Sequence, residues 1–270
     1  MKANTFLTLF IGIALIGGAS YFFTQDKKNP ATEVALAIAK AKPGISIIKK
    51  SEAKSINAFQ ASVFDYSNVK NTIEKKQVFF DTLRPIIIKQ NRLIEQQRNK
   101  ILLAQKNGNN QDWLKALADK YNVDWSNEKP NWERLLNRID TIPDELVMAQ
   151  AANESAWGLS RFAQKGNNLF GQWCFKKGCG IVPGQRNTGA NHEVRKFASI
   201  NDSVASYMHN LNTGRAYKDL RKLRAALRLT NASVDGHTLA KGLIKYSSRG
   251  KAYVKEIQSM IKTNKSLMNG

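Results

Sequence analysis

The sequence predicts a helix-dominated α+β protein, and three observations carry this prediction. Apolar residues recur at helical spacing over long stretches, first from Val69 to about Lys106 and later through the C-terminal third. Two segments, NNLFGQWCF and HEVRKFASI, have extended character instead and predict a small β-hairpin. The apolar fraction of 42% is ordinary for a globular protein, so the 270 residues suffice for one sizeable core or two modest ones.

The N-terminus carries an apolar run that predicts export. Lys2 is followed by TFLTLFIGIALIGGASYFF, which is apolar from Phe6 to Phe23 apart from Thr, Gly and Ser. Residues 1–25 are therefore expected to be a signal peptide or a membrane anchor. A cleavage site fits Gly17-Gly18-Ala19-Ser20, whereas an uncleaved span fits the full run, and both alternatives stay open. The remaining chain is expected in the periplasm, free or anchored to the inner membrane.

The rest of the chain divides into three regions. Residues 26–68 predict a linker with one short helix, from an Ala-rich stretch followed by KKSEAKS. Residues 69–130 predict a helical region that packs on the following domain, with Pro85 bending or splitting its long first helix. Residues 131–268 form the second domain, which holds both cysteines and the expected hairpin.

The charge balance indicates an anionic partner. Lysine and arginine number 42 against 21 acidic residues, a formal net charge of +21. Such a chain is attracted to polyanions of several kinds. The cations are spread around helices and the export segment opposes a nucleic-acid partner, so anionic envelope polymers, or the membrane if the segment is uncleaved, are the expected partners.

The only two cysteines, Cys174 and Cys179, lie in WCFKKGCG. An even number of close cysteines in an exported chain favours a disulfide. The three histidines are too scattered to complete a zinc spacing with the pair, so no metal is expected.

Glu154 is the candidate reactive residue. Pro143, Asp144 and Glu145 signal the start of a helix near residue 142, and Gly158 suits its C-terminal end. Glu154 then lies in the last turn on the same stripe as small apolar residues. Both burial and the helix dipole there favour the neutral carboxyl group, as a general acid requires. A buried ion pair with a nearby arginine is the competing interpretation.

Several separated blocks resemble a known family in the same order. AQAANESAWGLSRFAQKGNNLFGQW resembles the catalytic signature of the family-73 glycoside hydrolases, endo-β-N-acetylglucosaminidases that cut bacterial peptidoglycan and include the C-terminal domain of flagellar peptidoglycan hydrolases. The blocks IDTIPDELVMAQAANESAWG, NNLFGQWCFKKGCGIVPG and KFASINDSVASYM are similar to the Bax-type proteins of Gram-negative bacteria. The resemblance covers about residues 69–262 and implies a lysozyme-like glucosaminidase domain over 131–268.

The resemblance assigns the catalytic acid to Glu154 and places a second functional residue, Tyr246, beside it. Tyr246 lies in KYSSRGKAY, which is similar to the family's Y-[AS]-[TS] motif, although Arg249-Gly250 replaces its usual Asp-Pro. A core aromatic is the alternative for this tyrosine. The residues implied to line the sugar groove are Asn167, Asn168, Phe170 and Gln172, with Trp157 and Trp173 as candidates for stacking on sugar rings. Turn chemistry and core packing are the alternatives for these residues.

Glycosidases commonly use a second carboxylate, as a base or as a nucleophile. Glu193, in the expected cleft wall, is the candidate, because the other acids downstream of Glu154 predict caps or solvated positions: Asp202, Asp219, Asp235 and Glu256. If no carboxylate is near, the substrate's own 2-acetamido group can replace it.

The predicted function is hydrolysis of the β-1,4 bond after N-acetylglucosamine in peptidoglycan glycan strands, without a cofactor. A lytic transglycosylase and a non-catalytic cationic wall-binding module are the alternatives. Serine and metal hydrolases are disfavoured, because the chain has no G-x-S-x-G around Ser155 and no HExxH.

Overall fold

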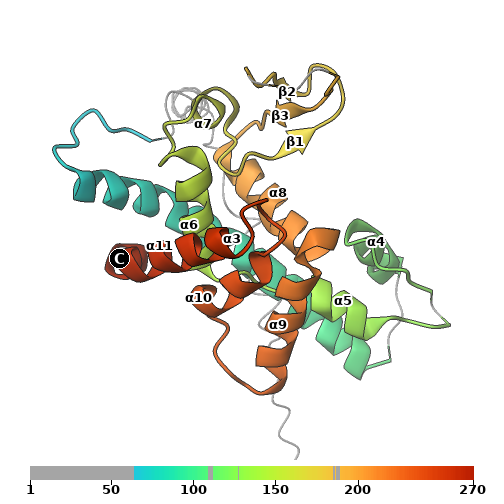
Figure 1. Ribbon diagram of the computed structural model, residues 1–270. Coiled ribbons are helices and arrows are strands. Elements are labelled where there is room, and N and C mark those ends of the chain that lie inside the picture. Colours follow the sequence, from blue (N-terminus) through green and yellow to red (C-terminus); the bar gives the residue numbers. More distant parts are fainter. Residues whose placement is uncertain (1–63, 109–111, 127, 185, 187–188) are drawn as a thin grey trace, which may run out of the picture. The chain divides into compact units, whose positions relative to one another are not determined.

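The computed structural model describes residues 64–270 except 109–111, 127, 185 and 187–188. The expected export segment and the linker up to residue 63 lie outside the described residues. Within the described part, no helix combines the length and the apolar character needed to cross a bilayer. The predicted α+β class is confirmed, because helices dominate and the described strands form one small antiparallel sheet (Figure 1).

The helices and strands follow one another along the chain, with the three strands inserted between helices of the second half. In order they are α3 (Thr72–Lys106), α4 (Asp112–Lys120), α5 (Trp132–Arg138), α6 (Asp144–Ser155), α7 (Arg161–Gly166), β1 (Trp173–Cys174), β2 (Gly180–Ile181), β3 (Glu193–Arg195), α8 (Ile200–Thr213), the 3-10 turn η1 (Arg215–Tyr217), α9 (Lys218–Leu229), α10 (Gly236–Leu239), the 3-10 turn η2 (Ala240–Leu243) and α11 (Lys251–Asn269).

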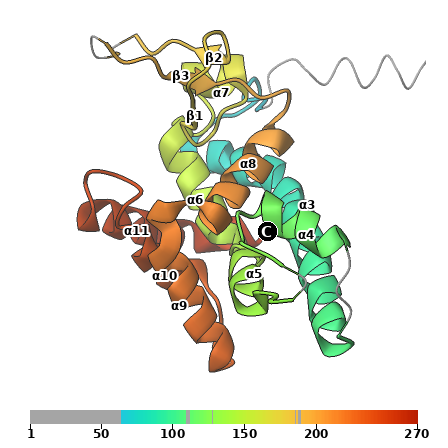
Figure 2. The ribbon, with the colours of Figure 1, turned by 90° about the vertical axis from the view of Figure 1, so that its right-hand side faces the viewer.

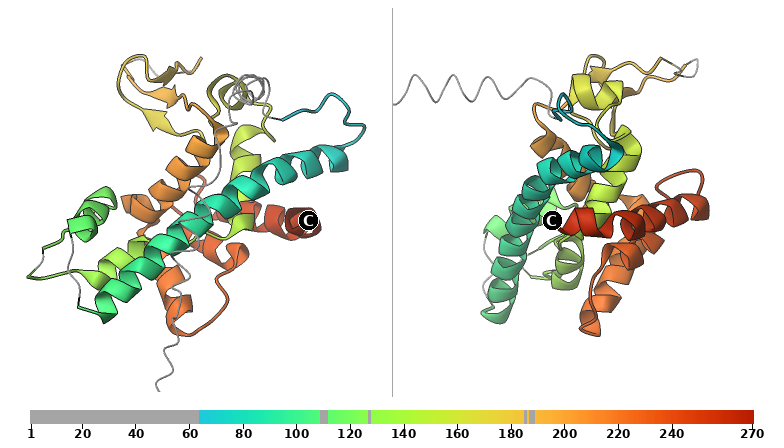
Figure 3. Two further views of the ribbon diagram at one scale, coloured as in Figure 1. Left: turned by 180° about the vertical axis from the view of Figure 1, so that it is seen from behind. Right: turned by 90° about the vertical axis from the view of Figure 1, so that its left-hand side faces the viewer.

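Helix α6 is the central helix of the described domain. It packs against α3, α10 and α11, and the views from the front and from behind show α3 and α11 on different sides of it (Figures 1 and 3). Its residues Leu146 to Ala152 are all buried, so the helix is enclosed on all sides along this stretch. A helix enclosed in this way gives its last turn a rigid support.

The long helix α3 shares one hydrophobic core with the second half of the chain. Asn71 caps its N-terminus by accepting hydrogen bonds from the backbone N–H groups of Ile73 and Glu74. Phe79 and Phe80 are fully buried in the same core as α6. Pro85 does not split the helix, because it lies on the exposed side, where water can satisfy the carbonyl group that proline leaves without a donor.

The sheet has one strand more than the expected hairpin. β1 and β2 both pair antiparallel with β3, in the order β1-β3-β2. The additional strand, β2, begins at Gly180, where a Cβ atom would lie 2.1 Å from the carbonyl oxygen of Val194. Only glycine permits this close approach. The sheet and α7 lie together at one end of the helices (Figure 2).

Helix α6 ends three residues before the glycine expected to close it. Ala156, Trp157 and Gly158 all have positive φ, and the Ser155 hydroxyl accepts a hydrogen bond from the backbone N–H of Gly158. This left-handed turn redirects the chain immediately after Glu154. The chain then forms the short helix α7, and the Ser199 hydroxyl caps α8 by accepting from the backbone N–H of Asp202.

Candidate active site

A groove of about 710 Å³ runs between the last turn of α6, the sheet and α8. Figures 1 and 2 show the sheet next to the C-terminal end of α6 and the N-terminal end of α8. Aromatic and amide side chains dominate its lining, which consists of Glu154, Phe162, Phe170, Gly171, Gln172, Trp173, Pro183, His192, Val194, Tyr207, Asn210, Tyr217 and Tyr246. Glu154 is the one carboxylate in this lining as far as the described residues reach.

Glu154 is held by one of its two carboxylate oxygens. Oε1 accepts hydrogen bonds from the Tyr253 hydroxyl at 2.8 Å and from Asn153 Nδ2 at 3.2 Å. Oε2 has no hydrogen-bond partner among the residues that the structure describes, and the side chain is half-buried. One oxygen is therefore anchored, and the other is available to a molecule in the groove.

The anchor of Glu154 continues inward as a chain of hydrogen bonds. The Tyr253 hydroxyl accepts from Gln150 Nε2 at 2.9 Å, and Gln150 Oε1 accepts from the hydroxyl of Tyr207. Gln150, Tyr207 and Tyr253 are all buried. Successive members of this hydrogen-bond chain come from different helices. The carboxylate is therefore oriented by α6, α8 and α11 together.

The tyrosines around Glu154 are neutral donors at any physiological pH. Burial raises the pKa of Tyr253, and the nearby Tyr246 and Glu154 raise it further. Burial also raises the pKa values of Tyr207, Tyr217 and Tyr246, and the charge of Glu154 adds to each of these effects. The rings of Tyr246 and Tyr253 stack with centroids 5.2 Å apart. Their hydroxyl groups therefore stay protonated and can donate hydrogen bonds.

Two of the predicted groove residues line the groove from the turn after α7. Phe170 stacks on Tyr207 with ring centroids 3.8 Å apart and forms part of the floor. Gln172 donates from Nε2 to the Ser203 carbonyl, and its Oε1 accepts from the Ser206 hydroxyl at 2.8 Å. The amide is thus fixed by α8, while its side chain remains half-buried at the groove wall.

Asn168 supports this turn from beneath and does not line the groove. It is 1% exposed, its Nδ2 donates to the carbonyls of Gln172 and Arg195, and its Oδ1 accepts from the backbone N–H of Phe170 and Gln172. Every hydrogen-bonding position of its amide is used by protein. Turn chemistry, the alternative expected for this residue, describes its contacts.

Asn167 and Trp157 also lie away from the groove lining. Asn167 ends α7 in a left-handed conformation, and its Nδ2 donates to the Phe197 carbonyl at 3.0 Å. Trp157 packs edge-on against Phe79 and Phe80, each with ring centroids 5.5 Å away. Its stacking surface is therefore occupied by α3. Trp173 is the tryptophan in the groove, where it is 58% exposed and stacks on His192.

Glu193 has its side chain on the face of β3 that does not line the groove. His192 and Val194 on either side line it, as the alternation of a strand requires. The two carboxylate oxygens of Glu193 accept from the backbone N–H groups of Gly178 and Gly180, at 2.9 and 2.7 Å. These two bonds lower the pKa of Glu193. A low pKa and two fixed oxygens suit a structural anion and argue against the acid–base role that the sequence suggested.

The loop that Glu193 holds is closed by the expected disulfide between Cys174 and Cys179, whose Cα atoms are 6.2 Å apart. Within the described residues these two sulfur atoms and the Glu193 carboxylate form the one close group of metal-binding atom types, and the disulfide engages both sulfurs. The loop is therefore fastened twice, covalently and through the carboxylate.

The remaining acidic residues downstream of Glu154 have other partners. Asp202 accepts from the Ser199 hydroxyl, and Asp235 caps α10 through the backbone N–H of Thr238. Asp219 pairs with a lysine and Glu256 with an arginine. None of the four lines the groove, as the sequence predicted for them.

Sequence reasoning missed Gln150 and Tyr253, which anchor Glu154. Tyr253 has the helical spacing of an ordinary core residue, and Gln150 lies one turn before Glu154 in a segment of small residues. A polar side chain within an otherwise buried helix is the available signal, because such a group requires a partner.

The fold and the groove define a class: a mostly helical α+β domain in which one half-buried glutamate faces a groove of aromatic and amide side chains, as in lysozyme-like glycosidases. Residues 129–266 match the family described as mannosyl-glycoprotein endo-beta-N-acetylglucosaminidase, the Glucosaminidase family. The chain is also 34% identical over 231 residues to the protein called Protein bax of Escherichia coli (strain K12). The aligned residues cover 82% of this chain and 81% of that protein. No solved structure matches the chain. The chain belongs to the Glucosaminidase family, with a domain of the glycosidase type, and is of the Bax type.

Proposed function

We propose that the protein hydrolyses the β-1,4 glycosidic bond after N-acetylglucosamine in peptidoglycan, with Glu154 as the general acid. The observation that carries this proposal is the asymmetry of the Glu154 carboxylate. Tyr253 and Asn153 hold Oε1, while Oε2 has no partner among the described residues and belongs to a groove-lining side chain. A proton on Oε2 is in a position to reach the oxygen of a glycosidic bond that lies in the groove.

The chemistry requires one more group. Protonation of the bridging oxygen breaks its bond to the anomeric carbon, and the positive charge that develops at that carbon must be compensated. In the described chain, Glu154 is the sole carboxylate that lines the groove, and Glu193 is engaged by Gly178 and Gly180. We therefore propose that the carbonyl oxygen of the substrate's 2-acetamido group bonds to the anomeric carbon. The new bond closes a five-membered ring on the sugar. Water then attacks the anomeric carbon, opens that ring and gives a proton to the Glu154 carboxylate, which restores the acid.

The groove has the composition that a sugar chain requires. Trp173 presents an exposed ring beside His192, and the apolar faces of sugar rings pack on such surfaces. Gln172 and Asn210 supply amide groups for hydroxyl and acetamido partners. Tyr246 lines the groove, its hydroxyl donates to the Phe170 carbonyl at 3.2 Å, and we propose that it contacts the sugar next to the bond that breaks.

An exported location agrees with this activity, since the substrate lies outside the cytoplasm. We propose that the chain acts in the periplasm, and that its net charge of +21 draws it to anionic polymers of the envelope. This attraction weakens as the salt concentration rises, because exposed charges are screened.

The chemical nature of the product ends tests the proposed reaction. Purified glycan strands are digested with the full chain, and the ends are identified by mass spectrometry after borohydride reduction. Hydrolysis as proposed yields reducing N-acetylglucosamine ends. Anhydromuramic ends would instead identify a lytic transglycosylase, and an absence of cleavage would favour a wall-binding module.

A further inference from the structure

A second cavity of about 690 Å³ lies between α5, η1 and α9. Its lining is basic. Arg134 and Arg138 come from α5, Arg215 from η1, and three further cations from α9, together with polar residues and one carboxylate: Lys218, Arg221, Lys222, Asn131, Asn137 and Glu133. We refer to this space as the basic cavity.

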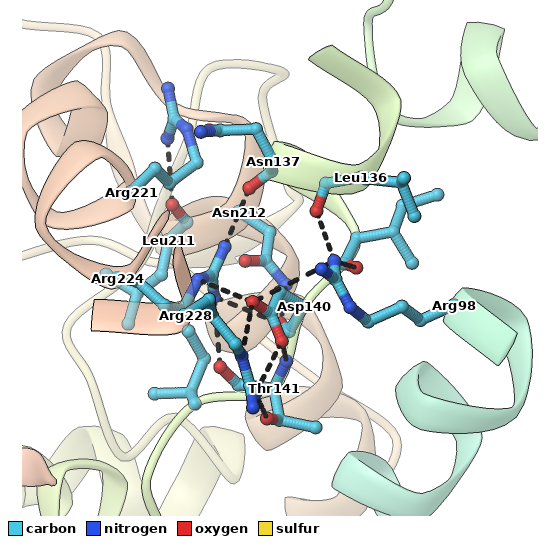
Figure 4. A network of polar contacts seen from close by, with 12 residues as sticks. Arg98, Leu136, Asn137, Asp140, Thr141, Leu211, Asn212, Arg221, Arg224 and Arg228 are labelled. Atoms are coloured by element: carbon cyan, nitrogen blue, oxygen red, sulfur yellow. Dashed lines mark hydrogen bonds and ion pairs between the residues drawn. The ribbon is translucent and has the colours of Figure 1, made fainter. Parts of the chain in front are cut away.

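The cations of the basic cavity lack an acidic partner in the part of the chain that the structure describes. Among the described residues, none of the six forms an ion pair, and Glu133 is in none either. The arginines next to the cavity differ from them. Arg98, Arg224 and Arg228 converge on the buried Asp140, whereas Arg221 points away from it toward the Leu211 carbonyl (Figure 4).

Arg221 is a buried member of this set of cations, with 5% of its surface exposed. Its Nη1 donates to the carbonyls of Leu211 and Gly214, while its Nε and Nη2 make no hydrogen bond with any described residue. Burial, then the charges of Arg138 and Arg134, lowers the pKa of Arg221 to about 10. A buried guanidinium with unused donors and like-charged neighbours gains free energy when an anion enters.

The basic cavity is adjacent to the groove. Arg215 and Tyr217 belong to the same 3-10 turn, and Arg215 lines the cavity while Tyr217 lines the groove. An extended peptide of three to five residues spans roughly 10–18 Å at 3.3–3.6 Å per residue. A peptide attached to a sugar in the groove can therefore extend past η1 into the cavity.

We infer that the basic cavity binds the carboxylate groups of the peptide side chains of peptidoglycan while the glycan strand occupies the groove. Six cations spread over two helices and a turn suit a short chain with several separate carboxylates better than one compact ion. Guanidinium groups bind carboxylates in a bidentate manner, and Arg221 offers two unused donors for this. This inference rests on the proposed function and adds a specificity for peptide-bearing strands.

The test compares two substrates with three forms of the full chain. The substrates are glycan strands with their peptides and the same strands after an amidase has removed the peptides. The forms are the wild type, the double variant Arg134→Gln with Lys222→Gln, and the control Lys255→Gln with Lys262→Gln, which removes two exposed charges from α11. The expected result is about a tenfold increase in KM of the cavity variant for the peptide-bearing strands, because charge-assisted contacts are lost. We expect no change for the peptide-free strands, and no change in the control.

An equal increase in KM for both substrates, an equal increase in the control, or no increase at all would overturn the inference. Direct binding separates it from the proposed function. A synthetic peptide with free carboxylates is titrated into the full chain carrying Glu154→Gln and followed by NMR, with inorganic phosphate in parallel. Peptide binding that the cavity variant abolishes supports the inference even if no glycan is cleaved, and binding of phosphate alone refutes it.

Discussion

Replacing Tyr253 by phenylalanine removes one hydroxyl group from the anchor of Glu154. The Tyr253 hydroxyl donates to Glu154 Oε1 at 2.8 Å and accepts from Gln150 Nε2 at 2.9 Å. Gln150 is fully buried, so its N–H group is left without an acceptor, at a cost of about 1–3 kcal/mol. At 2–4 °C per kcal/mol for a domain of this size, a loss of about 2 kcal/mol lowers Tm by roughly 4–8 °C.

The same change acts on catalysis in a way that lost stability alone does not. Without the Tyr253 donor, Glu154 Oε1 loses the contact that fixes the carboxyl group from α11. We expect kcat to fall about tenfold because the acid is less well positioned. Steady-state hydrolysis of glycan strands, together with thermal melts, measures both effects.

The matched control for this variant is Tyr66→Phe. Tyr66 donates its hydroxyl to the Trp157 carbonyl at 2.6 Å, away from the groove lining. It loses the same atom and one hydrogen bond, so its Tm falls while its kcat keeps the wild-type value. An unchanged kcat in Tyr253→Phe would refute the anchoring role.

Three further changes test other parts of the account. Asp140→Asn leaves the buried Arg224 without its counter-charge and lowers the free energy of unfolding by about 3–5 kcal/mol in urea denaturation. Glu193→Gln lowers Tm most near neutral pH. Because the pKa of Glu193 is lowered in the folded protein, its carboxylate contributes fully to stability above the ordinary pKa of 4.5, and this contribution is lost as the pH falls through the folded-state pKa. In acid, the Tm of the variant therefore approaches that of the wild type. Trp173→Ala increases KM for glycan strands about tenfold and leaves Tm nearly unchanged, since the ring is exposed in the groove.

Each of these changes has a control on the same chain. Asp119→Asn breaks an exposed pair with Lys115 and costs less than about 1 kcal/mol. Glu128→Gln, the control for Glu193→Gln, removes an exposed carboxylate and leaves Tm nearly unchanged. Trp157→Leu, the control for Trp173→Ala, lowers Tm but leaves KM for glycan strands unchanged. Glu193→Gln should also retain hydrolysis, and loss of cleavage without loss of folding would return Glu193 to a chemical role.

The position of Glu154 in the last turn of a helix could be predicted from the sequence because the signals are local. Pro143 precedes α6, Asp144 and Glu145 lie in its first turn, and the observed helix runs from Asp144 to Ser155. The family resemblance implied Phe170 and Gln172 in the groove and Tyr246 beside Glu154, and all of them belong to the groove lining.

The surroundings of the acid depend on contacts between distant parts of the chain. Tyr253 meets Glu154 across 99 residues and Gln150 across 103, so helical spacing alone presents it as a core aromatic. The face on which Glu193 lies depends on how β3 pairs with its neighbours, and a shift of one residue reverses it. The two-residue strand β2 is too short to produce a periodic signal, and Gly158 follows a left-handed turn that no helical pattern marks.

The central claim is that Glu154 supplies the proton that breaks the glycosidic bond, and the rate of cleavage by Glu154→Gln tests it most directly. The amide keeps the size of the side chain but has no acidic proton to donate. We expect the variant to fold with a Tm near that of the wild type and to cleave glycan strands at least about a hundredfold more slowly, while Glu128→Gln cleaves at the wild-type rate. Cleavage by Glu154→Gln at the wild-type rate would contradict the account.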